Sequence, residues 1–260
     1  THQLLKTCSL DFIVYDYLAE ITMSIMARAR VRDQDAGYAT DFLTGAMKPN
    51  LKEIARQGTK IISNAGGVNP RSCVTELRGI IAEQGLNLKV ACILGDDLFY
   101  KRDQFHGSDI CEMFSGEPFP SISDVASINA YLGAFPIAKA LATGADIVVT
   151  GRCVDSAVTL GACIDAFGWR REDLDRLAMG ALAGHILECG PQATGGNFTD
   201  WHQVSNLAHI GYPIIEIYDH GNFVCSKPAG SGGLVTVGTI SEQMVYEIGD
   251  PQAYILPDVI

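Results

Sequence analysis

The sequence predicts an α/β fold: a mainly parallel, Rossmann-like sheet with helices on both faces and a β-rich C-terminal portion. Short runs rich in Val and Ile, without polar alternation, lie at 10–15, 59–63, 89–94 and 146–149. Such runs are typical of strands buried on both faces. A helix-like segment follows each run. Residues 59–94 also have the pattern of a complete β-α-β unit, whose helix opens with the favoured N-cap pair Asn69-Pro70.

Helices are expected between these strands. The first strand leads into a helix at 18–32, where Leu18, Ile21, Ile25, Met26 and Ala29 share one side. The helix opened by Asn69-Pro70 ends at a glycine, which favours helix termination. The other segments with helical spacing are 51–56, 124–132, 136–142, 156–167 and 172–189.

The C-terminal portion has a different character. The apolar runs 212–218 and 222–226 flank Asp219-His220-Gly221, a pattern that predicts a hairpin. Residues 100–124 form a long excursion of the kind used for lids and binding loops. We expect an α/β core over 1–210 and a hairpin-containing portion over 211–260 that is continuous with it.

Composition excludes several classes of protein. The net charge of −11 argues against a nucleic-acid surface, which needs clustered Lys and Arg. No apolar stretch reaches the roughly 18 residues that span a bilayer, and the N-terminus lacks the apolar segment of a signal peptide. Eight cysteines without a C-x-x-C pair favour reduced thiols and a cytoplasmic location. The apolar fraction of 47% suffices for a sizeable core, and the slightly apolar mean hydropathy of +0.14 favours a homo-oligomer. The expected partner is a small-molecule substrate.

Polar and glycine-rich segments follow the predicted strands, where open parallel sheets bind ligands. After the second strand, Asn64, Gly66, Gly67 and Asn69 are candidate ligand-binding residues, because glycines admit a ligand and a helix N-terminus attracts anions. The alternative is a tight connection that needs glycine for its backbone angles. No G-x-G-x-x-G pattern or P-loop is present.

Two carboxylates follow the third strand. Asp96 and Asp97 are candidate ligand-binding residues, and their oxygens would suit Mg²⁺ as a cofactor. Alternatively, Asp97 caps a short helix and Asp96 accepts hydrogen bonds from loop N–H groups. No other residue is assigned to a metal.

Three residues are candidates for catalysis. Arg152 follows the fourth strand and suits a carboxylate or phosphate, while Asp155 would orient it or act as general base. The alternative is an internal Arg–Asp pair. His185 suits proton transfer, or stabilises a helix end as a cation. His185 and Glu188 occur in the order H-x-x-E, the reverse of the order typical of metal-binding helices. Lys227 opens a glycine-rich loop and is a candidate ligand-binding residue, the alternative being turn chemistry alone.

Several of these motifs together resemble one family. The stretches are NAGGVNP (64–70), TGRCVDS (150–156), GHILECG (184–190), KPAGSGGLVT (227–236) and YILPDV (254–259). They resemble the AtuA family, the acyclic terpene utilisation proteins, through nearly the whole chain and in the same order. The resemblance implies that both ends are truncated relative to the family, whose members begin with a G-x-G-x-x-G-D-R-like segment. It also implies a place in the degradation of citronellol- and geraniol-type compounds through CoA thioesters.

These expectations combine into a function. The chain is expected to be an enzyme of acyclic terpene or branched carboxylic acid catabolism, acting on an acyl-CoA or a related acid as a lyase or hydratase. Asp155 or His185 would be the base, and Arg152 with the amides after Asn64 would stabilise an enolate. The alternative is a non-catalytic ligand-binding or scaffold subunit of a larger catabolic assembly.

Overall fold

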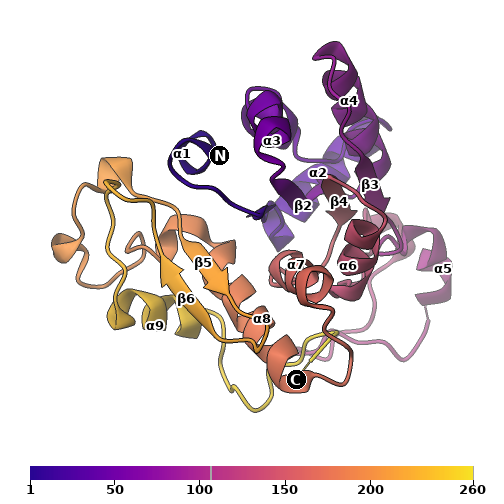
Figure 1. Cartoon of the computed structure of the whole chain (residues 1–260). Helices are drawn as coiled ribbons and strands as arrows, with labels where there is room; N and C mark the ends of the chain where they lie inside the picture. Colours follow the sequence, from indigo (N-terminus) through magenta and orange to yellow (C-terminus); the bar gives the residue numbers. More distant parts are fainter. Residues whose placement is uncertain (106, 260) are drawn as a thin grey trace.

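A four-stranded parallel sheet forms the centre of the molecule. The computed structural model describes residues 1–105 and 107–259. The strand order is β1-β2-β4-β3, and every neighbouring pair is parallel (Figure 1). The strands are β1 (Phe12–Tyr15), β2 (Lys60–Gly67), β3 (Val90–Ile93) and β4 (Ile147–Gly151). The predicted α/β class with a mainly parallel sheet is therefore confirmed.

The second strand runs further than the sequence predicts. Pairing between β2 and β4 follows a regular register up to Ser63 and then shifts before Gly67. Asn64 thus lies within the strand, and the expected glycine loop is instead the irregular end of β2. Because all four strands are parallel, the segments after them meet at one edge of the sheet.

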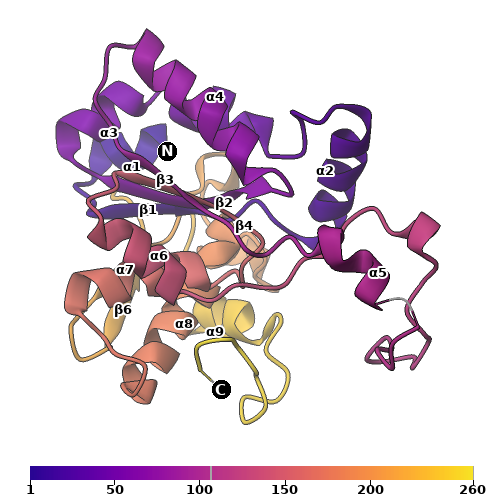
Figure 2. The same cartoon turned by 90° about the vertical axis from the view of Figure 1, so that its right-hand side faces the viewer.

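Helices cover both faces of this sheet (Figure 2). α3 (Leu51–Gln57) and α4 (Pro70–Glu83) lie on one face, and α6 (Phe135–Ala142) and α7 (Ala157–Phe167) lie on the other. Side chains alternate between two cores, as the strand period requires: Ile61 packs with the α3 and α4 side, and Ile62 packs with the α6 and α7 side. Both isoleucines are fully buried. Continuous apolar runs are therefore needed in these strands.

Other helices border the sheet. They are α1 (His2–Thr7), α2 (Glu20–Arg32), the π-helical segment η1 (Phe42–Met47) and the short α5 (Arg102–Phe105). The 3₁₀ turns are η2 (Phe99–Lys101), η3 (Ile122–Asp124), η4 (Gly190–Gln192), η5 (Trp201–Gln203) and η6 (Leu207–His209). No helix within residues 1–105 and 107–259 combines the length and apolarity needed to cross a membrane.

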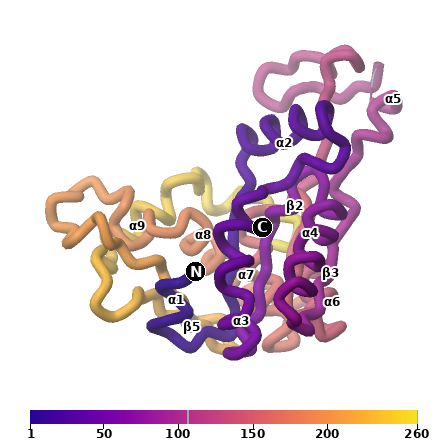
Figure 3. Tube along the Cα trace, turned by 90° about the horizontal axis from the view of Figure 1, so that it is seen from above, coloured from indigo at the N-terminus to yellow at the C-terminus, as the bar shows by residue number. Residues whose placement is uncertain are grey.

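The predicted hairpin of the C-terminal portion lies with two helices, one before it in the chain and one after it. β5 (Ile214–Ile217) and β6 (Phe223–Ser226) pair antiparallel, which confirms the hairpin. α8 (Leu174–Glu188) and α9 (Val237–Val245) lie with it on one side of the sheet (Figure 3). The chain then returns to the core, where the Ala134 backbone N–H donates to Asp258 Oδ2 at 2.6 Å.

Two helical expectations are wrong in detail. Residues 124–132 contain only the end of η3 and are otherwise extended, because their backbone bonds to the loop after β3, with Ala130 N–H donating to the Asp96 carbonyl. In α2, Ile21 and Ile25 are 71% and 58% exposed, whereas Met26 is buried. The predicted apolar face of that helix is therefore rotated away from the core.

Candidate active site

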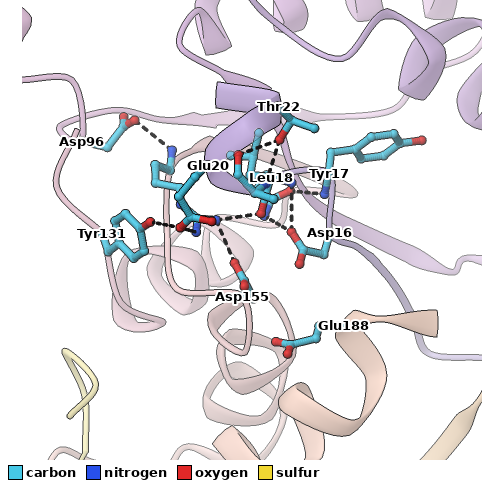
Figure 4. A network of polar contacts seen from close by, with 12 residues as sticks. Asp16, Tyr17, Leu18, Glu20, Thr22, Asp96, Tyr131, Asp155 and Glu188 are labelled. Carbon is cyan, nitrogen blue, oxygen red and sulfur yellow. Dashed lines mark hydrogen bonds and ion pairs between the residues drawn. The ribbon is translucent and has the colours of Figure 1, made fainter. Parts of the chain in front are cut away.

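Polar side chains from three strands meet at the carboxyl edge of the sheet (Figure 4). Asn64 in β2 donates from Nδ2 to Asp16 Oδ1 at 2.5 Å and accepts from the Tyr17 N–H at 2.7 Å. Asp96, after β3, accepts from the Arg152 N–H, after β4, at 2.8 Å. The structure thus brings Asn64, Asp96 and Arg152 to one edge, as parallel strands require. Asp16 joins them from the end of β1.

Arg152 is held by protein groups on several sides. Its Nη1 donates to the Leu18 carbonyl at 2.9 Å and to Asp155 Oδ1 at 2.8 Å. Its Cζ lies 4.1 Å from the centre of the Tyr131 ring, and the residue is only 3% exposed. Burial disfavours the charge, yet Asp155 and Tyr131 raise the pKa of Arg152 above its usual value. The guanidinium therefore links the loop that carries Asp155 to the segment after β1 by hydrogen bonds.

The two carboxylates after β3 are also occupied by protein donors. Asp96 accepts from the Arg152 N–H and from Asn129 Nδ2, both at 2.8 Å. Asp97 Oδ2 accepts from Arg30 at 2.6 Å, and its Oδ1 accepts from the Phe99 N–H at 2.9 Å. This arrangement matches the alternative in which the two aspartates accept hydrogen bonds from the loop and do not bind a metal ion. A Mg²⁺ ion at this position would have to displace these donors.

The glycines at the end of β2 allow close packing. A Cβ on Gly66 would lie 2.6 Å from the Thr150 carbonyl oxygen. Gly67 has a φ of +54°, and a Cβ there would collide with Met26 of α2. Close packing therefore explains why glycine is needed at these two positions.

Asn69 and Lys227 are engaged in their own loops. Asn69 Oδ1 caps α4 by accepting from the Ser72 N–H at 3.3 Å, and its Nδ2 donates to the Gln34 carbonyl at 2.9 Å. Lys227 Nζ donates to the Ser231 carbonyl at 2.9 Å, within the loop after β6. These contacts give Asn69 and Lys227 structural roles within their own loops.

His185 lies in the last turn of α8 and faces α9. Its Nε2 is 3.1 Å from the Gln243 carbonyl oxygen and 3.2 Å from the Met244 carbonyl oxygen. Gln243 returns a bond from Nε2 to the His185 carbonyl at 3.1 Å. On the other side of the ring, Nδ1 lies 2.9 Å from Glu188 Oε1. Burial opposes protonation of the imidazole, but Glu188 raises the pKa of His185 overall.

Three carboxyl groups gather beside Arg152. Asp16, Asp155 and Glu188 each offer an oxygen, and these oxygens lie within 4.8 Å of one another. In Figure 4, Glu188 on α8 faces the two aspartates with no dashed line to either. Asp16 and Glu188 are not among the site residues predicted from the sequence. Asp16 follows a buried strand as Asp96 does, so the same signal could have found it.

Burial and mutual repulsion set the acidity of this cluster. Burial and the nearby Asp16 charge raise the pKa of Asp155 to about 6, although Arg152 opposes the shift. Burial likewise raises the pKa of Glu188 to about 7, although His185 opposes it. Burial also raises the pKa of Asp16. Closely spaced carboxyl groups with raised pKa values are typical of sites for proton transfer.

A second set of possible metal ligands overlaps this cluster. His185, Glu188 and the exposed Glu247 each offer an atom, and these atoms also lie within 4.8 Å of one another. Glu247 lies in the turn after α9. Glu188 therefore belongs to both groups.

A cavity of about 530 Å³ adjoins two of the clustered carboxyl groups, those of Asp16 and Glu188. Its wall includes Asp16, Asp41 and Glu188 together with apolar side chains. The apolar lining residues are Leu4, Ile13, Val14, Ala46 and Leu187. A hollow of about 490 Å³ between α1 and the end of α3 has no carboxylate among its lining residues. We therefore regard the first cavity as the candidate substrate site.

Comparison with known proteins adds one relationship. The sequence model described as "Acyclic terpene utilisation family protein AtuA" matches residues 1–260, the whole chain. No curated protein and no solved structure matches the chain.

Proposed function

The chain belongs to the AtuA family, and on this premise we propose that it is an enzyme of acyclic terpene catabolism that hydrates, or dehydrates, a branched acyl thioester such as an acyl-CoA. One observation carries the proposal. The oxygens of Asp16, Asp155 and Glu188 converge within 4.8 Å beside a cavity of about 530 Å³. That volume is in the usual range for small-molecule sites.

The cavity wall suits an uncharged acyl group. Its apolar residues suit a branched hydrocarbon chain, whereas Asp16, Asp41 and Glu188 would repel a free carboxylate. A thioester presents the same acyl group without a negative charge at its carbonyl. The site therefore favours the thioester over the free acid.

The aspartate pair supplies the proton transfer. Asp155 lies 2.8 Å from the Arg152 cation, which favours its ionised form and a role as general base. Asp16 Oδ1 accepts from the Leu18 N–H and from Asn64, so its other oxygen is left to carry a proton. Adjacent carboxyl groups that share one proton divide acid and base roles in this way.

The reaction balances with these groups. In hydration, Asp155 takes a proton from water as the water oxygen bonds to the β-carbon, and Asp16 donates a proton to the α-carbon. The carbon–carbon π bond breaks while a C–O and a C–H bond form. Elimination of water is the reverse, with the roles exchanged.

Turnover by the pure protein tests the proposal. A branched α,β-unsaturated acyl-CoA should lose its conjugated thioester absorbance, and Asp155→Asn should slow this by roughly 10²–10⁴-fold. Asp219→Asn is the matched control, because the Asp219 side chain is 79% exposed in the hairpin turn. Tight binding of the thioester without turnover would instead identify a ligand-binding or scaffold subunit.

We also propose a cytoplasmic homo-oligomer. All eight cysteines are free thiols, which suits a reducing compartment. Ile21 and Ile25 on α2 and Met113 and Phe114 in the 100–124 excursion are largely exposed, and a second copy would cover such apolar surface. Light scattering at micromolar concentration should give a mass above that of one chain, and a monomer mass would contradict this.

A further inference from the structure

We propose that His185, Glu188 and Glu247 bind a divalent transition-metal ion. Their ligand atoms, one nitrogen and two carboxylate oxygens, lie within 4.8 Å of one another. Two residues come from the last turn of α8, and the third comes from the turn after α9. This site goes beyond the thioester reaction. It shares Glu188 with the carboxyl cluster of the proposed function, but its test measures metal binding and does not depend on turnover.

The hydrogen bonds of His185 prepare Nδ1 as a ligand. Nε2 faces the carbonyl oxygens of Gln243 and Met244, which can only accept, so Nε2 must carry a hydrogen. In the neutral ring, Nδ1 then presents its lone pair toward Glu188. Histidines that bind metals typically donate their other N–H to a carbonyl or carboxylate in this way.

His185 Nδ1 and Glu188 Oε1 face each other and are not engaged by other described groups. The two atoms are buried and lie 2.9 Å apart, but they form no hydrogen bond with each other or with another residue that the structure describes. The two side chains are 2% and 4% exposed. A proton on Nδ1 or a metal ion can supply the positive charge that these two atoms need, and the two compete for the same position.

The spacing of this pair fits one ion. Two ligand atoms that are each about 2.1 Å from a metal and at about a right angle lie about 3 Å apart. The observed distance from Nδ1 to Oε1 is 2.9 Å. Such a right angle is typical of octahedral coordination, in which water and Glu247 would complete the shell.

The surroundings favour a dication with affinity for nitrogen. Carboxylate oxygens of Asp16 and Asp155 lie within 4.8 Å of one on Glu188 and add negative charge, while Arg152 is engaged by Asp155. Imidazole together with carboxylates selects first-row metals such as Mn²⁺ or Zn²⁺ over Mg²⁺, which prefers oxygen alone. Glu247 is exposed, so it can close onto an ion that enters from solvent.

Isothermal titration of the metal-free full chain tests the site. We expect Mn²⁺ to bind at one ion per chain, and Mg²⁺ to bind at least about tenfold more weakly. Glu247→Gln should weaken Mn²⁺ binding by about 10-fold or more, and Glu188→Gln should abolish it. Glu216→Gln is the matched control, because Glu216 is exposed on β5. Pulsed electron paramagnetic resonance of bound Mn²⁺ should show coupling to an imidazole nitrogen.

Two results would overturn the assignment. One is the absence of Mn²⁺ and Zn²⁺ binding by chain that unfolds cooperatively. The other is Mn²⁺ binding that survives Glu247→Gln but is lost in Asp155→Asn, without nitrogen coupling, since the ion would then belong to the Asp16–Asp155–Glu188 group. Glu247 is exposed, so its replacement should leave the melting temperature unchanged and the comparison valid.

Discussion

Asp96 and Glu188 are both buried acidic side chains near the carboxyl edge of the sheet, yet their surroundings are opposite. Asp96 accepts hydrogen bonds from the Arg152 N–H and from Asn129. Glu188 faces His185 Nδ1 and two other carboxyl groups, and its Oε1 has no hydrogen-bond partner. The Asp96 carboxylate links the ends of β3 and β4, whereas the Glu188 carboxylate is repelled by the neighbouring carboxyl groups of Asp16 and Asp155.

This difference indicates that Asp96 supports the fold, whereas Glu188 belongs to the candidate site. A hydrogen bond to a charged group typically contributes about 1.5–3 kcal/mol to stability, so the bonds of Asp96 offset its burial. Glu188 has His185 Nδ1 at 2.9 Å but also two nearby carboxyl groups that oppose its charge, and a buried carboxyl group perturbed in this way is usually retained for function. The scaffold side of the edge should therefore respond to mutation through folding, and the Glu188 side through binding and catalysis.

Arg152→Ala should have the largest effect on folding. Removing the guanidinium leaves Asp155, whose side chain is 26% exposed, without its cation and the Leu18 carbonyl without its donor, which costs about 3 kcal/mol in the free energy of unfolding. Urea denaturation followed by circular dichroism measures this. If the protein keeps its stability but loses affinity for an acyl-CoA, Arg152 belongs with Glu188 on the functional side.

Asp96→Asn should have an intermediate effect. Asp96 Oδ2 accepts both bonds, and an amide oxygen in its place can keep them, but each bond then loses the ionised acceptor that strengthens it. We expect a loss of about 1.5–3 kcal/mol in unfolding free energy. The same denaturation series checks it, and an unchanged midpoint with altered Mn²⁺ or Mg²⁺ binding would revive the metal interpretation of Asp96.

Asp97→Asn should have a small effect, although Asp97 is the next residue. The Asp97 and Arg30 side chains are 36% and 20% exposed, and such partly exposed ion pairs contribute about 1 kcal/mol or less. Asn would keep the bond from the Phe99 N–H. A thermal melt should show a shift of only a few degrees, and a loss as large as that of Asp96→Asn would show that burial is not what separates the two.

The fold was largely predictable because buried parallel strands leave a local signature. Residues 59–94 predicted β2, α4 and β3, and the convergence of Asn64, Asp96 and Arg152 followed from parallel strands alone. The helix predicted over residues 124–132 is absent, because the backbone of this segment bonds to groups distant in sequence, including the Asp96 carbonyl. Local spacing carries no record of such partners.

The centre of the candidate site was less predictable for the same reason. The H-x-x-E order of His185 and Glu188 argued against a metal-binding helix. The sequence pattern could not show that Glu247, in a turn after another helix, lies beside this pair. Asp16 meets Glu188 only because α8 packs beside the sheet edge. Contacts of this kind depend on tertiary structure, which periodicity does not encode.

The free energy of unfolding of Glu188→Gln, measured in urea without metal, tests the central claim most directly. The amide that this substitution introduces can donate to His185 Nδ1, and the carboxyl cluster loses one charge. The account predicts a stability equal to that of the unchanged protein or higher by roughly 1–2 kcal/mol. A loss of about 2 kcal/mol or more, comparable to that of Asp96→Asn, would show that Glu188 is part of the scaffold and would contradict the account.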